Sequence, residues 1–393
     1  MASTLNVAVE GCCHGDLDRI YDVLGSFHDN DNTPVDFMIC CGDFQAIRTH
    51  EELETLACPP VYRHMKDFHK YWSAASVPRC LTLFIGGNHE APGHLREMYF
   101  GGFASKDIFY LGSSGVFNVG GLRIAALSGI FKYHDYDKPI FEAPPYTENT
   151  KRSAYHVRRY DIEKLKLISQ PVDIVISHDW PRGITNYGDT EHMLRLKDRT
   201  GQLRQEINSG QLGNPHTMDL LKILKPKYWF AGHMHVKYAA LYEHPDGSLT
   251  RFLALDKCIP RRPFVQLLGI EPDTARVTEL RQGPGSSPKV RLDPEWLAIL
   301  KVNNAAMPVG TSSNVPLRKP TFEDIQLVNT LLSKKSVSEF PYFGQIHPGN
   351  DRYRKWICDL LEMTDRIDET SAVEIPAAAE PAPASDNLLF FED

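Results

Sequence analysis

Short apolar runs that end in a turn and a polar residue recur along this chain, and the recurrence constrains the fold more than any other feature. Each run has the length of a buried strand, and residues 17–27 after the first run have helical apolar spacing. The five runs, each with its polar residues, are 5–11 with Cys12 and His14, 35–41 with Asp43, 80–85 with Asn88 and His89, 172–176 with His178, and 228–230 with His233 and His235. In open α/β sheets, ligands bind at such strand ends. The pattern therefore predicts an α/β fold whose strand ends deliver side chains that can bind a metal.

The last of these runs ends in Gly-His-Met-His, which places His233 and His235 two residues apart. In an extended segment alternate side chains point the same way, so both imidazoles can reach one point. Imidazole is the commonest side-chain metal ligand, which favours a metal site. A short histidine motif is a weak signal by itself, and the alternative is a polar strand end with two surface histidines.

Each of the other polar residues also has a structural interpretation when it is considered alone. Asp43 and Asn88 could be ordinary turn residues, since both types are common in turns. His178 could be a hydrogen-bonded core histidine, and Cys12 could be a small buried apolar residue. Because all five sets stand at strand ends, chance placement is a poor explanation of the whole pattern, and the metal site is the better hypothesis.

Composition bounds the class of protein without choosing its function. The chain has 393 residues, of which 42% are hydrophobic and 24% charged, as expected for a globular protein with a sizeable core. Its apolar stretches are shorter than the ~20 residues of a membrane span, and its first residues do not resemble a signal peptide. The 8 cysteines lack the spacing of a disulfide framework, so free thiols in a reducing compartment are expected. A net charge of −7 argues against a general basic coat for nucleic acid. A nucleic-acid substrate would therefore have to be held by a local basic patch or by metal ions.

Residues 131–159 form a long stretch without apolar periodicity, in which aromatic and basic side chains alternate. A loop of this length in a compact domain is usually functional or disordered. Aromatic rings stack on the bases of single-stranded nucleic acid and cations bind its phosphates, whereas the alternative is an excursion whose rings pack back on the body. The candidate nucleic-acid contacts are Tyr133, His134, Tyr136, Lys138, Tyr146, Tyr155, His156 and Arg158.

The remaining segments suggest a catalytic domain followed by a smaller region. Residues 49–76 are predicted to be helical, 115–130 to form a hairpin, and 238–268 to form further strands with a turn at Asp246-Gly247. Residues 281–320 are rich in Gly, Pro, Ser and Asn and are expected to cross the surface, whereas 322–332 and 353–363 have helical spacing. The predicted divisions are 1–262 for the catalytic domain with 131–159 as an insertion, 263–365 for a C-terminal region, and 366–393 for a disordered Ala/Pro/Glu-rich tail.

The polar residues at the strand ends suit hydrolysis of a phosphorus ester. Asp43 follows its strand in a Gly-Asp turn, and its two oxygens can bridge two cations, while the histidines and the Asn88 carbonyl supply further ligands. Two metals ~3.5–4 Å apart clamp the attacking and leaving oxygens of an in-line displacement and acidify a bound water. His89 lies beside a ligand and can protonate the leaving oxygen as a general acid. We therefore predict His89, Asp43 and Asn88 as catalytic residues.

The order and character of these five blocks resemble the calcineurin-like metallophosphoesterases over about residues 1–260. The matching motifs are Cys12-x-His14, Gly42-Asp43, Gly87-Asn88-His89-Glu90, His178 and Gly232-His233-x-His235. The resemblance implies an α/β fold, namely an αββα sandwich of two mixed β-sheets flanked by helices, with the metal ligands at the strand ends. A smaller C-terminal region would follow this sandwich.

One position departs from the general pattern of that superfamily, because Cys12 stands where an aspartate is expected. Together with the Gly-Cys-Cys-His-Gly context, the insertion at 131–159 and the distinct C-terminal region, this departure makes the chain similar to the RNA lariat debranching enzymes. That family hydrolyses the 2′–5′ phosphodiester at the branch point of excised introns, which linearises the lariat for turnover. The resemblance implies that residues 131–159 are the lariat-recognition loop.

The same resemblance implies a set of metal ligands and a general acid. One metal would be held by His14, Asp43 and His235 with Cys12 nearby, and the other by Asp43, Asn88, His178 and His233. His89 would be the general acid for the 2′-hydroxyl leaving group. One or two divalent ions are expected, Fe, Zn or Mn, and a Cys12 thiolate would favour Zn or Fe because it is softer than a carboxylate.

The resemblance also implies a partner and a compartment. Branched intron RNA would be the partner and the nucleus the compartment, and we expect a monomer without membrane association. One alternative is a general metallophosphoesterase that acts on nucleotides or phosphoproteins, and another is a scaffold that has lost catalysis. The loop at 131–159 favours RNA, because a small substrate needs no such platform, and the retained ligands count against loss of catalysis.

Overall fold

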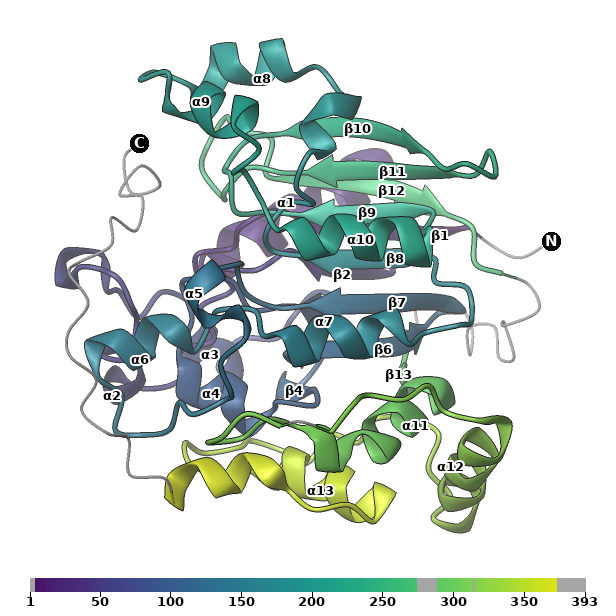
Figure 1. Ribbon diagram of the computed structural model, residues 1–393. Coiled ribbons are helices and arrows are strands. Elements are labelled where there is room, and N and C mark those ends of the chain that lie inside the picture. Colours follow the sequence, from purple (N-terminus) through teal and green to yellow (C-terminus); the bar gives the residue numbers. More distant parts are fainter. Residues whose placement is uncertain (1–3, 274–287, 314, 373–393) are drawn as a thin grey trace.

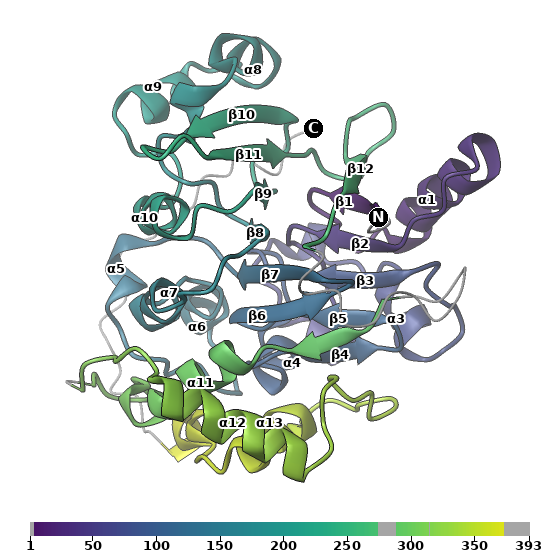
Figure 2. The same ribbon diagram turned by 90° about the vertical axis from the view of Figure 1, so that its right-hand side faces the viewer.

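Two β-sheets stacked face to face form the centre of the computed structural model, which describes residues 4–273, 288–313 and 315–372. From edge to edge, the six-stranded sheet contains β12 (Val265–Ile270), β1 (Leu5–Glu10), β2 (Phe37–Cys40), β3 (Leu81–Phe84), β5 (Ile108–Tyr110) and β4 (Gly102–Ser105). The seven-stranded sheet contains β10 (Tyr238–Glu243), β11 (Leu249–Ala254), β9 (Tyr228–Ala231), β8 (Ile174–Ser177), β7 (Leu122–Leu127), β6 (Ser114–Val119) and β13 (Val290–Leu292). Figure 2 shows the two layers side by side with helices on their outer faces.

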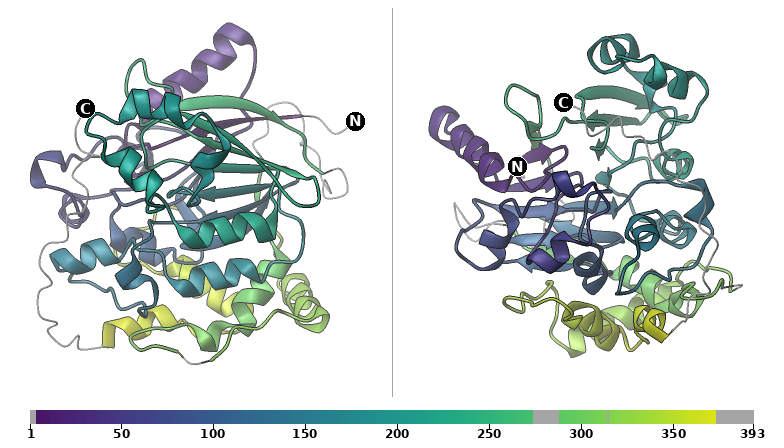
Figure 3. Two further views of the ribbon diagram at one scale, coloured as in Figure 1. Left: turned by 45° about the horizontal axis from the view of Figure 1, so that its top comes forward. Right: turned by 90° about the vertical axis from the view of Figure 1, so that its left-hand side faces the viewer.

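Helices cover both outer faces of this sandwich, which confirms the predicted αββα arrangement of two mixed sheets. The first sheet is covered by α1 (Leu17–Asp31) and α3 (Phe68–Trp72), and the second by α7 (Arg159–Lys166) and α10 (Pro215–Leu224) (Figure 2). The other helices are α2 (His50–Leu53), η1 (Pro60–Tyr62), α4 (Pro92–Glu97), α5 (Tyr133–Tyr136), α6 (Glu148–Ser153), η2 (Ile184–Tyr187), α8 (Thr190–Lys197), α9 (Gln202–Asn208), α11 (Pro294–Val302), η3 (Asn304–Ala306), α12 (Phe322–Lys334), α13 (Arg352–Leu361) and η4 (Arg366–Ala372). Figures 1 and 3 place α11, α12 and α13 at one end of the sandwich and α8 and α9 at the other.

The strands that carry the predicted ligands are parallel within each sheet. Val7 of β1 lies opposite Phe37 of β2, and Phe37 lies opposite Leu81 of β3; strands β7, β8 and β9 are also parallel. Every residue of β2 is buried, because both faces of a parallel sheet are covered, and this explains the continuous apolar runs. The predicted strands are therefore confirmed, and their carboxyl ends meet at one edge of each sheet.

Residues 49–76 differ from the single helical segment that the sequence predicts. They contain three short helices, α2, η1 and α3, joined by loops. Pro59 and Pro60 stand in the middle of the segment, and proline lacks the backbone donor that a helix interior requires. Phe68 and Tyr71 of α3 are nevertheless buried, so the apolar residues of this segment do contribute to the core.

The prediction that residues 281–320 cross the surface is wrong for much of the described part of this segment. Strand β13 and helix α11 lie within it, and residues 281–287 lie outside the described residues. Asp293 caps α11 by accepting a hydrogen bond from the Trp296 backbone N–H at 2.9 Å, and the Trp296 side chain is 1% exposed. Both elements are short, and the surrounding Gly, Pro, Ser and Asn residues conceal their periodicity.

The C-terminal region shares both sheets with the rest of the chain. Strand β12 pairs antiparallel with β1, placing Ile270 opposite Leu5, and β13 pairs antiparallel with β6. The Arg123 guanidinium on β7 reaches α11, with Nε 2.8 Å from Asp293 and Nη2 2.9 Å from Glu295. The sheets therefore cross the division that the sequence predicts after residue 262.

Replacement of Asp293 with alanine is expected to lower the free energy of unfolding by about 3–5 kcal/mol, because it leaves the buried Arg123 charge without its bidentate partner. Urea denaturation followed by circular dichroism measures this loss. Asp246→Asn is the control, since the exposed Lys225–Asp246 ion pair contributes little. Equal denaturation midpoints for the two variants would show that the buried pair does not stabilise the fold.

The last two predicted helices are confirmed, whereas the predicted tail begins too early. Helices α12 and α13 lie where the sequence predicts them, but η4 continues past residue 366. Ile367 is buried, and its carbonyl accepts a hydrogen bond from Arg96 Nη2 at 2.7 Å. Residues 373–393 of the predicted disordered tail lie outside the described residues. No helix in the described part of the chain has both the length and the apolar character of a membrane span.

Candidate metal centre

The five strand ends bring the predicted ligands together around Asp43. His14 Nε2 lies 3.7 Å from Asp43 Oδ2, whereas His178 Nε2 lies 3.3 Å from Asp43 Oδ1, so the two imidazoles approach different oxygens of one carboxylate. His14 follows β1, Asp43 follows β2, and His178 follows β8, so the centre spans both sheets. The carboxylate can therefore bridge two groups of ligands, as the sequence predicts.

The Asp43 side chain is 1% exposed and is held in a tight turn. Its backbone has a positive φ of 48°, a conformation that Asp adopts more readily than most residues, and its Oδ1 accepts the His89 backbone N–H at 2.9 Å. Burial opposes the charge, but His178, His89 and His14 outweigh it and hold the pKa of this carboxyl well below its usual range. Asp43 is thus ionised and offers both oxygens as ligands.

The histidines of the centre are oriented, but their pKa values shift in different directions. His178 Nδ1 donates to the Cys41 carbonyl at 2.7 Å, which turns Nε2 toward Asp43 and toward Asn88 Oδ1, 3.3 Å away. Burial lowers the pKa of His14 to about 3, that of His233 also to about 3, and that of His235 well below its usual range. Against the effect of burial, the charge of Asp43 raises the pKa of His178. Metal ligands must present lone pairs, and neutral imidazoles provide them.

The first group of ligands contains Cys12, His14, Asp43 and His235, whose donor atoms all lie within 4.8 Å of one another. His14 Nε2 and His235 Nε2 are 3.0 Å apart. Cys12 Sγ accepts the His233 backbone N–H at 2.9 Å, and burial raises the pKa of this thiol well above its usual range. The sulfur is therefore in place beside the group, but it needs a nearby cation to ionise.

The second group of ligands contains Asp43, Asn88, His178 and His233. The His178 and His233 rings are 5.0 Å apart between centroids. Ligands that share an ion with bonds of 2.0–2.2 Å lie roughly 3–3.5 Å apart. The 3.3 Å distances from His178 Nε2 to Asp43 and to Asn88 fall in that range, as does the 3.0 Å distance between His14 and His235. The donor atoms and their spacings thus fit divalent metal ions.

His89 lies at the rim of the centre and differs from the ligands in its position. Its backbone N–H bonds to Asp43, its side chain is 6% exposed, and its ring centroid is 5.2 Å from that of His14. Burial lowers the pKa of His89, while Asp43 opposes this effect. The ring is therefore close to the Asp43 carboxylate but belongs to neither group of predicted ligands. This position suits a proton donor.

Glu90 is a positioning residue that the sequence analysis did not single out. Its carboxylate accepts backbone N–H groups of Phe44 at 2.7 Å, Gln45 at 2.9 Å and Gly87 at 3.1 Å, and so joins the Asp43 turn to the Asn88 turn. Burial, followed by the charge of Asp43, raises the pKa of Glu90 to about 8. The sequence marks Glu90 only by its place directly after Gly-Asn-His. The partners of its hydrogen bonds become apparent only in the folded structure.

Replacement of Glu90 with glutamine is expected to weaken metal binding by about 10–100-fold, because an amide cannot accept all the N–H groups that orient the two turns. Titration of the metal-free protein with Zn or Mn, followed by calorimetry, measures the affinity. Glu243→Gln on the exposed face of β10 is the matched control. Unchanged affinity in Glu90→Gln would show that the turns hold their shape without this carboxylate.

Residues 131–159 are more regular than the sequence predicts. Helices α5 and α6 lie within the segment, and a β-bridge joins Ile130 to His156. Of the predicted RNA contacts, Tyr133, His134 and Lys138 are exposed, Tyr146 and Tyr155 are half-buried, and Tyr136, His156 and Arg158 are buried. The segment is therefore a folded loop, and part of it packs back on the body as the alternative interpretation proposed.

Internal pairs explain why three of these side chains are buried. His156 Nδ1 donates to Asp135 Oδ2 at 2.6 Å, and Arg158 pairs with Glu142. The Tyr136 ring stacks on His216, with centroids 4.0 Å apart. Such contacts fix the shape of the loop, and Tyr133, His134 and Lys138 remain exposed.

The loop begins beside the metal centre. The Phe131 backbone N–H donates to Asp179 Oδ2 at 3.2 Å, and Asp179 directly follows His178. Two residues later Tyr133 is 88% exposed. The structure thus places an exposed aromatic ring within a few residues of a predicted ligand.

Two stacked mixed sheets with these donors at their strand ends define a class of metal-dependent phosphoesterase. A family model described as calcineurin-like phosphoesterase matches residues 5–237 and confirms this class, which implies the use of a divalent metal. A second model, described as lariat debranching enzyme, C-terminal domain, matches residues 247–355.

Several relatives that share the name lariat debranching enzyme resemble the chain over most of its length. Lariat debranching enzyme of Danio rerio is 48% identical over 305 residues, which is 76% of this chain and 51% of that protein. The Homo sapiens relative is 46% identical over 79% of this chain and 56% of its own length, and the Arabidopsis thaliana relative is 44% identical over 89% and 81%. The chain belongs to the lariat debranching enzyme family. It spans about half the length of the vertebrate relatives named here.

Proposed function

We propose that this chain hydrolyses the 2′–5′ phosphodiester at the branch point of excised intron lariat RNA, which linearises the RNA for turnover. The observation that carries the proposal is the approach of His14 and His178 to separate oxygens of Asp43, with His89 beside them. Family membership supports the substrate, since the relatives are named for lariat debranching.

Two divalent ions fit the residues of the centre. His14, Asp43 and His235 would hold one ion with Cys12 beside it, and Asp43, Asn88, His178 and His233 would hold the other. When bound, the ions would supply an activated water and neutralise charge on the phosphate. The low pKa values of His14 and His233 and the ionised Asp43 support this assignment, because the protein need not lose protons from these three groups to accept the metal.

The residues of this chain would orient the scissile bond and move one proton. His89 donates a proton to the departing 2′-oxygen, which would otherwise leave as a poorly stable alkoxide. The hydrogen bond from its backbone to Asp43 fixes the position of the donor relative to the bridging carboxylate. Glu90 keeps the two turns together, so the acid and the ligands retain one geometry during the reaction.

The exposed side of the loop would bind the RNA near the branch. Tyr133 offers a ring for stacking, and Lys138 and His134 offer polar contacts. Of the other predicted contacts, Tyr146 and Tyr155 are half-buried and Tyr136, His156 and Arg158 are buried, so none of these five would form the outer surface of the loop. This local patch reconciles RNA binding with the net charge of −7.

The proposal extends to the identity of the metals, which we infer to be Fe, Zn or Mn. Cys12 Sγ lies within the first ligand group, and a thiolate prefers Zn or Fe. Cys12→Asp is expected to shift the preference toward Mn, measured as metal content and activity after metal-free protein is loaded with each ion. The control is Cys12→Ser. The same Cys→Asp change at Cys358 in α13 would not serve, because Cys358 is buried. The same metal preference in all three proteins would overturn the role of the sulfur.

The decisive experiment compares three substrates with the metal-loaded protein. A branched RNA with one 2′–5′ linkage, a linear 3′–5′ RNA and a p-nitrophenyl phosphate diester would be tested side by side. Selective cleavage of the 2′–5′ bond is the expected result. Cleavage of the small ester alone would replace the proposal with a general metallophosphoesterase of nucleotides or phosphoproteins, and no cleavage of any substrate would indicate a scaffold.

Nuclear residence and a monomeric state belong to the same proposal. An enzyme of excised introns meets its substrate where introns are removed, which supports the nucleus. Imaging of a fluorescent fusion tests the compartment, and light scattering tests the mass in solution against 44.5 kDa. Exclusion of the fusion from the nucleus, or a mass of twice that value, would overturn the respective part.

A further inference from the structure

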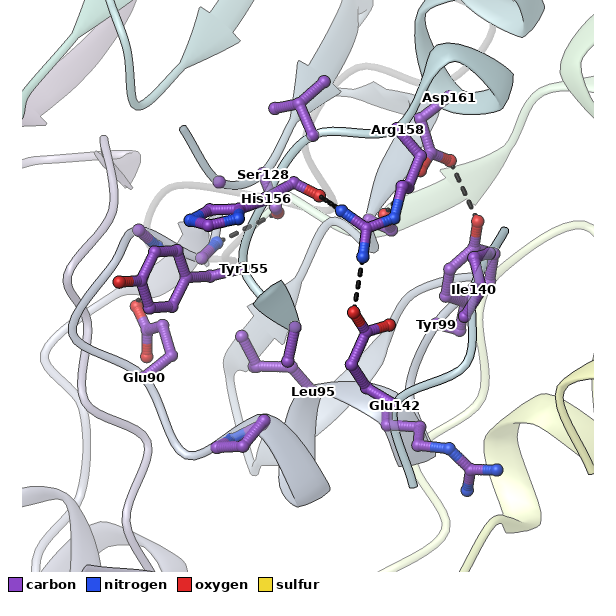
Figure 4. Close-up of a pocket in the computed structure, with 18 of the residues that line it drawn as sticks. Glu90, Leu95, Tyr99, Ser128, Ile140, Glu142, Tyr155, His156, Arg158 and Asp161 are labelled. Atoms are coloured by element: carbon purple, nitrogen blue, oxygen red, sulfur yellow. Dashed lines mark hydrogen bonds and ion pairs between the residues drawn. The ribbon is translucent and has the colours of Figure 1, made fainter. Parts of the chain in front are cut away.

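A cavity of about 100 Å³ lies between the loop at 131–159 and helix α4 (Figure 4). Its wall includes Gly86, Gly87 and Glu90 of the turn that carries Asn88 and His89. A single water needs only about 10–15 Å³, so this space is large enough for a planar ring. The cavity therefore lies next to the backbone turn that carries Asn88 and His89.

The lining of the cavity is aromatic and carries several charged groups. Figure 4 shows Tyr99 and Tyr155 on opposite sides, with Arg158 and Glu142 joined across one wall. Four of the predicted RNA contacts line the space, although Arg158 and His156 are buried. These four residues are Tyr146, Tyr155, His156 and Arg158. Their common position gives them a role other than contact at the outer surface.

The charges of the lining disfavour a phosphate. Of the lining carboxyl groups, Glu142 pairs with Arg158 and Asp161 pairs with Lys164 at 3.0 Å, while burial raises the pKa of Glu90 to about 8. Arg158 is engaged by Glu142 and by the His156 carbonyl at 3.1 Å, and Arg96 donates to the Ile367 carbonyl at 2.7 Å. An anion would thus meet guanidiniums that already have partners, whereas a neutral ring does not require a free cation.

Three lining side chains each carry a buried polar atom that has no hydrogen-bond partner among the described residues. They are Tyr146 Oη, His156 Nε2 and Arg158 Nε. Because Asp135 accepts from His156 Nδ1 at 2.6 Å, the neutral ring presents Nε2 as an acceptor, whereas Arg158 Nε can only donate. Buried polar atoms are usually paired, so this mixed set is complementary to a ligand that both donates and accepts.

We propose that the cavity receives one nucleobase of the branched RNA, splayed out from a nucleotide next to the branch. A base is planar, is neutral, and has both donors and acceptors on its edge, and proteins bind splayed RNA bases between aromatic rings. The inference rests on the proposed function, since it names a further subsite for that substrate. Occupation would press on Glu90 and Gly87 and so link base recognition to the turn that carries His89.

Two variants test the cavity without touching the metal ligands. Tyr146→Phe removes one unpartnered hydroxyl, and loss of one hydrogen bond is expected to raise Kd roughly 3–10-fold. Ala154→Leu fills the space and should raise Kd roughly 5–100-fold, the range for loss of one stacked base. Tyr342→Phe and Ala239→Leu make the same changes at exposed positions outside the cavity and serve as controls.

Binding is measured by fluorescence anisotropy with metal-loaded protein and a branched RNA whose branch phosphate is replaced by an uncleavable triazole. The branch nucleotide and each of its three neighbours are made abasic in turn. One abasic change should weaken binding to the native protein and to both controls, yet leave Ala154→Leu unaffected, because that variant no longer admits the base. Equal weakening of all proteins by every abasic change would overturn the inference, and so would the absence of any binding to branched RNA.

Cleavage of the natural branched RNA is followed in parallel, so that the two proposals fail separately. If the native protein binds the branched RNA in the expected pattern but leaves the 2′–5′ bond intact, the proposed function fails and the base subsite stands. If it cleaves that bond while Tyr146→Phe and Ala154→Leu keep native KM and Kd values, the function stands and the subsite fails. Tyr146→Phe keeps the test decisive if Ala154→Leu does not fold.

Discussion

Glutamine in place of His89 is expected to slow cleavage of the 2′–5′ bond by about 10²–10⁴-fold, the usual contribution of a general acid. The backbone N–H of residue 89 still donates to Asp43 in this variant, so the turn and the ligands stay in place. Metal content should therefore match that of the native protein. Single-turnover cleavage of a branched RNA measures the loss, and metal analysis measures the content.

A second substrate distinguishes proton donation from a structural role for His89. A p-nitrophenyl diester has a leaving group that departs readily without a proton, so the His89→Gln variant should hydrolyse it at nearly the native rate. His192→Gln makes the same change on the exposed surface of α8 and is the matched control. Equal losses on both substrates would show that His89 shapes the site and does not protonate the leaving oxygen.

Asparagine in place of Asp43 is expected to lower kcat by roughly 10³-fold or more, because metals supply several kcal/mol of transition-state stabilisation and each 1.36 kcal/mol is a factor of ten. An amide has one oxygen ligand and no charge, so it cannot bridge the groups that His14 and His178 approach. Bound metal should fall from two ions to one or none, measured by plasma mass spectrometry.

Asp189→Asn provides the control for the change at Asp43. Asp189 is exposed and caps α8 by accepting the His192 backbone N–H at 2.9 Å, a role that asparagine fills equally well. This variant should keep native activity and native metal content. Full occupancy of both ions in Asp43→Asn would refute a bridging role for the carboxylate, whatever the activity of that variant.

The parts of the site that the sequence predicted share one property: their signal is local. Each predicted ligand follows an apolar run that is buried on both faces, as β2 is, so the run and the polar residue mark a strand end together. The convergence of His14 and His178 on Asp43 then follows from parallel strands that end at one edge. The same logic predicted the hairpin of β6 and β7, whose turn is Gly120-Gly121.

The parts that the sequence did not predict depend on contacts between distant residues. Asp135 and His156 are 21 residues apart, and Glu142 and Arg158 are 16 apart, so no short motif pairs them, yet these contacts bury two of the predicted RNA-binding side chains. Glu90 acts on Phe44, 46 residues away. Helix α11 was missed because a short helix in a Gly- and Pro-rich segment has too few turns to display a period.

Because β12 pairs with β1, completion of the first sheet depends on the order in which the chain is synthesised. Residues 7–10 of β1 pair with β2 on one side and with β12 on the other, and these two neighbouring strands are more than two hundred residues apart in the sequence. Closing so long a loop is slow, and the first sheet stays incomplete on the ribosome until Ile270 has emerged. A protein truncated at residue 262 would expose the open hydrogen-bonding edge of β1 and would be prone to aggregate through it.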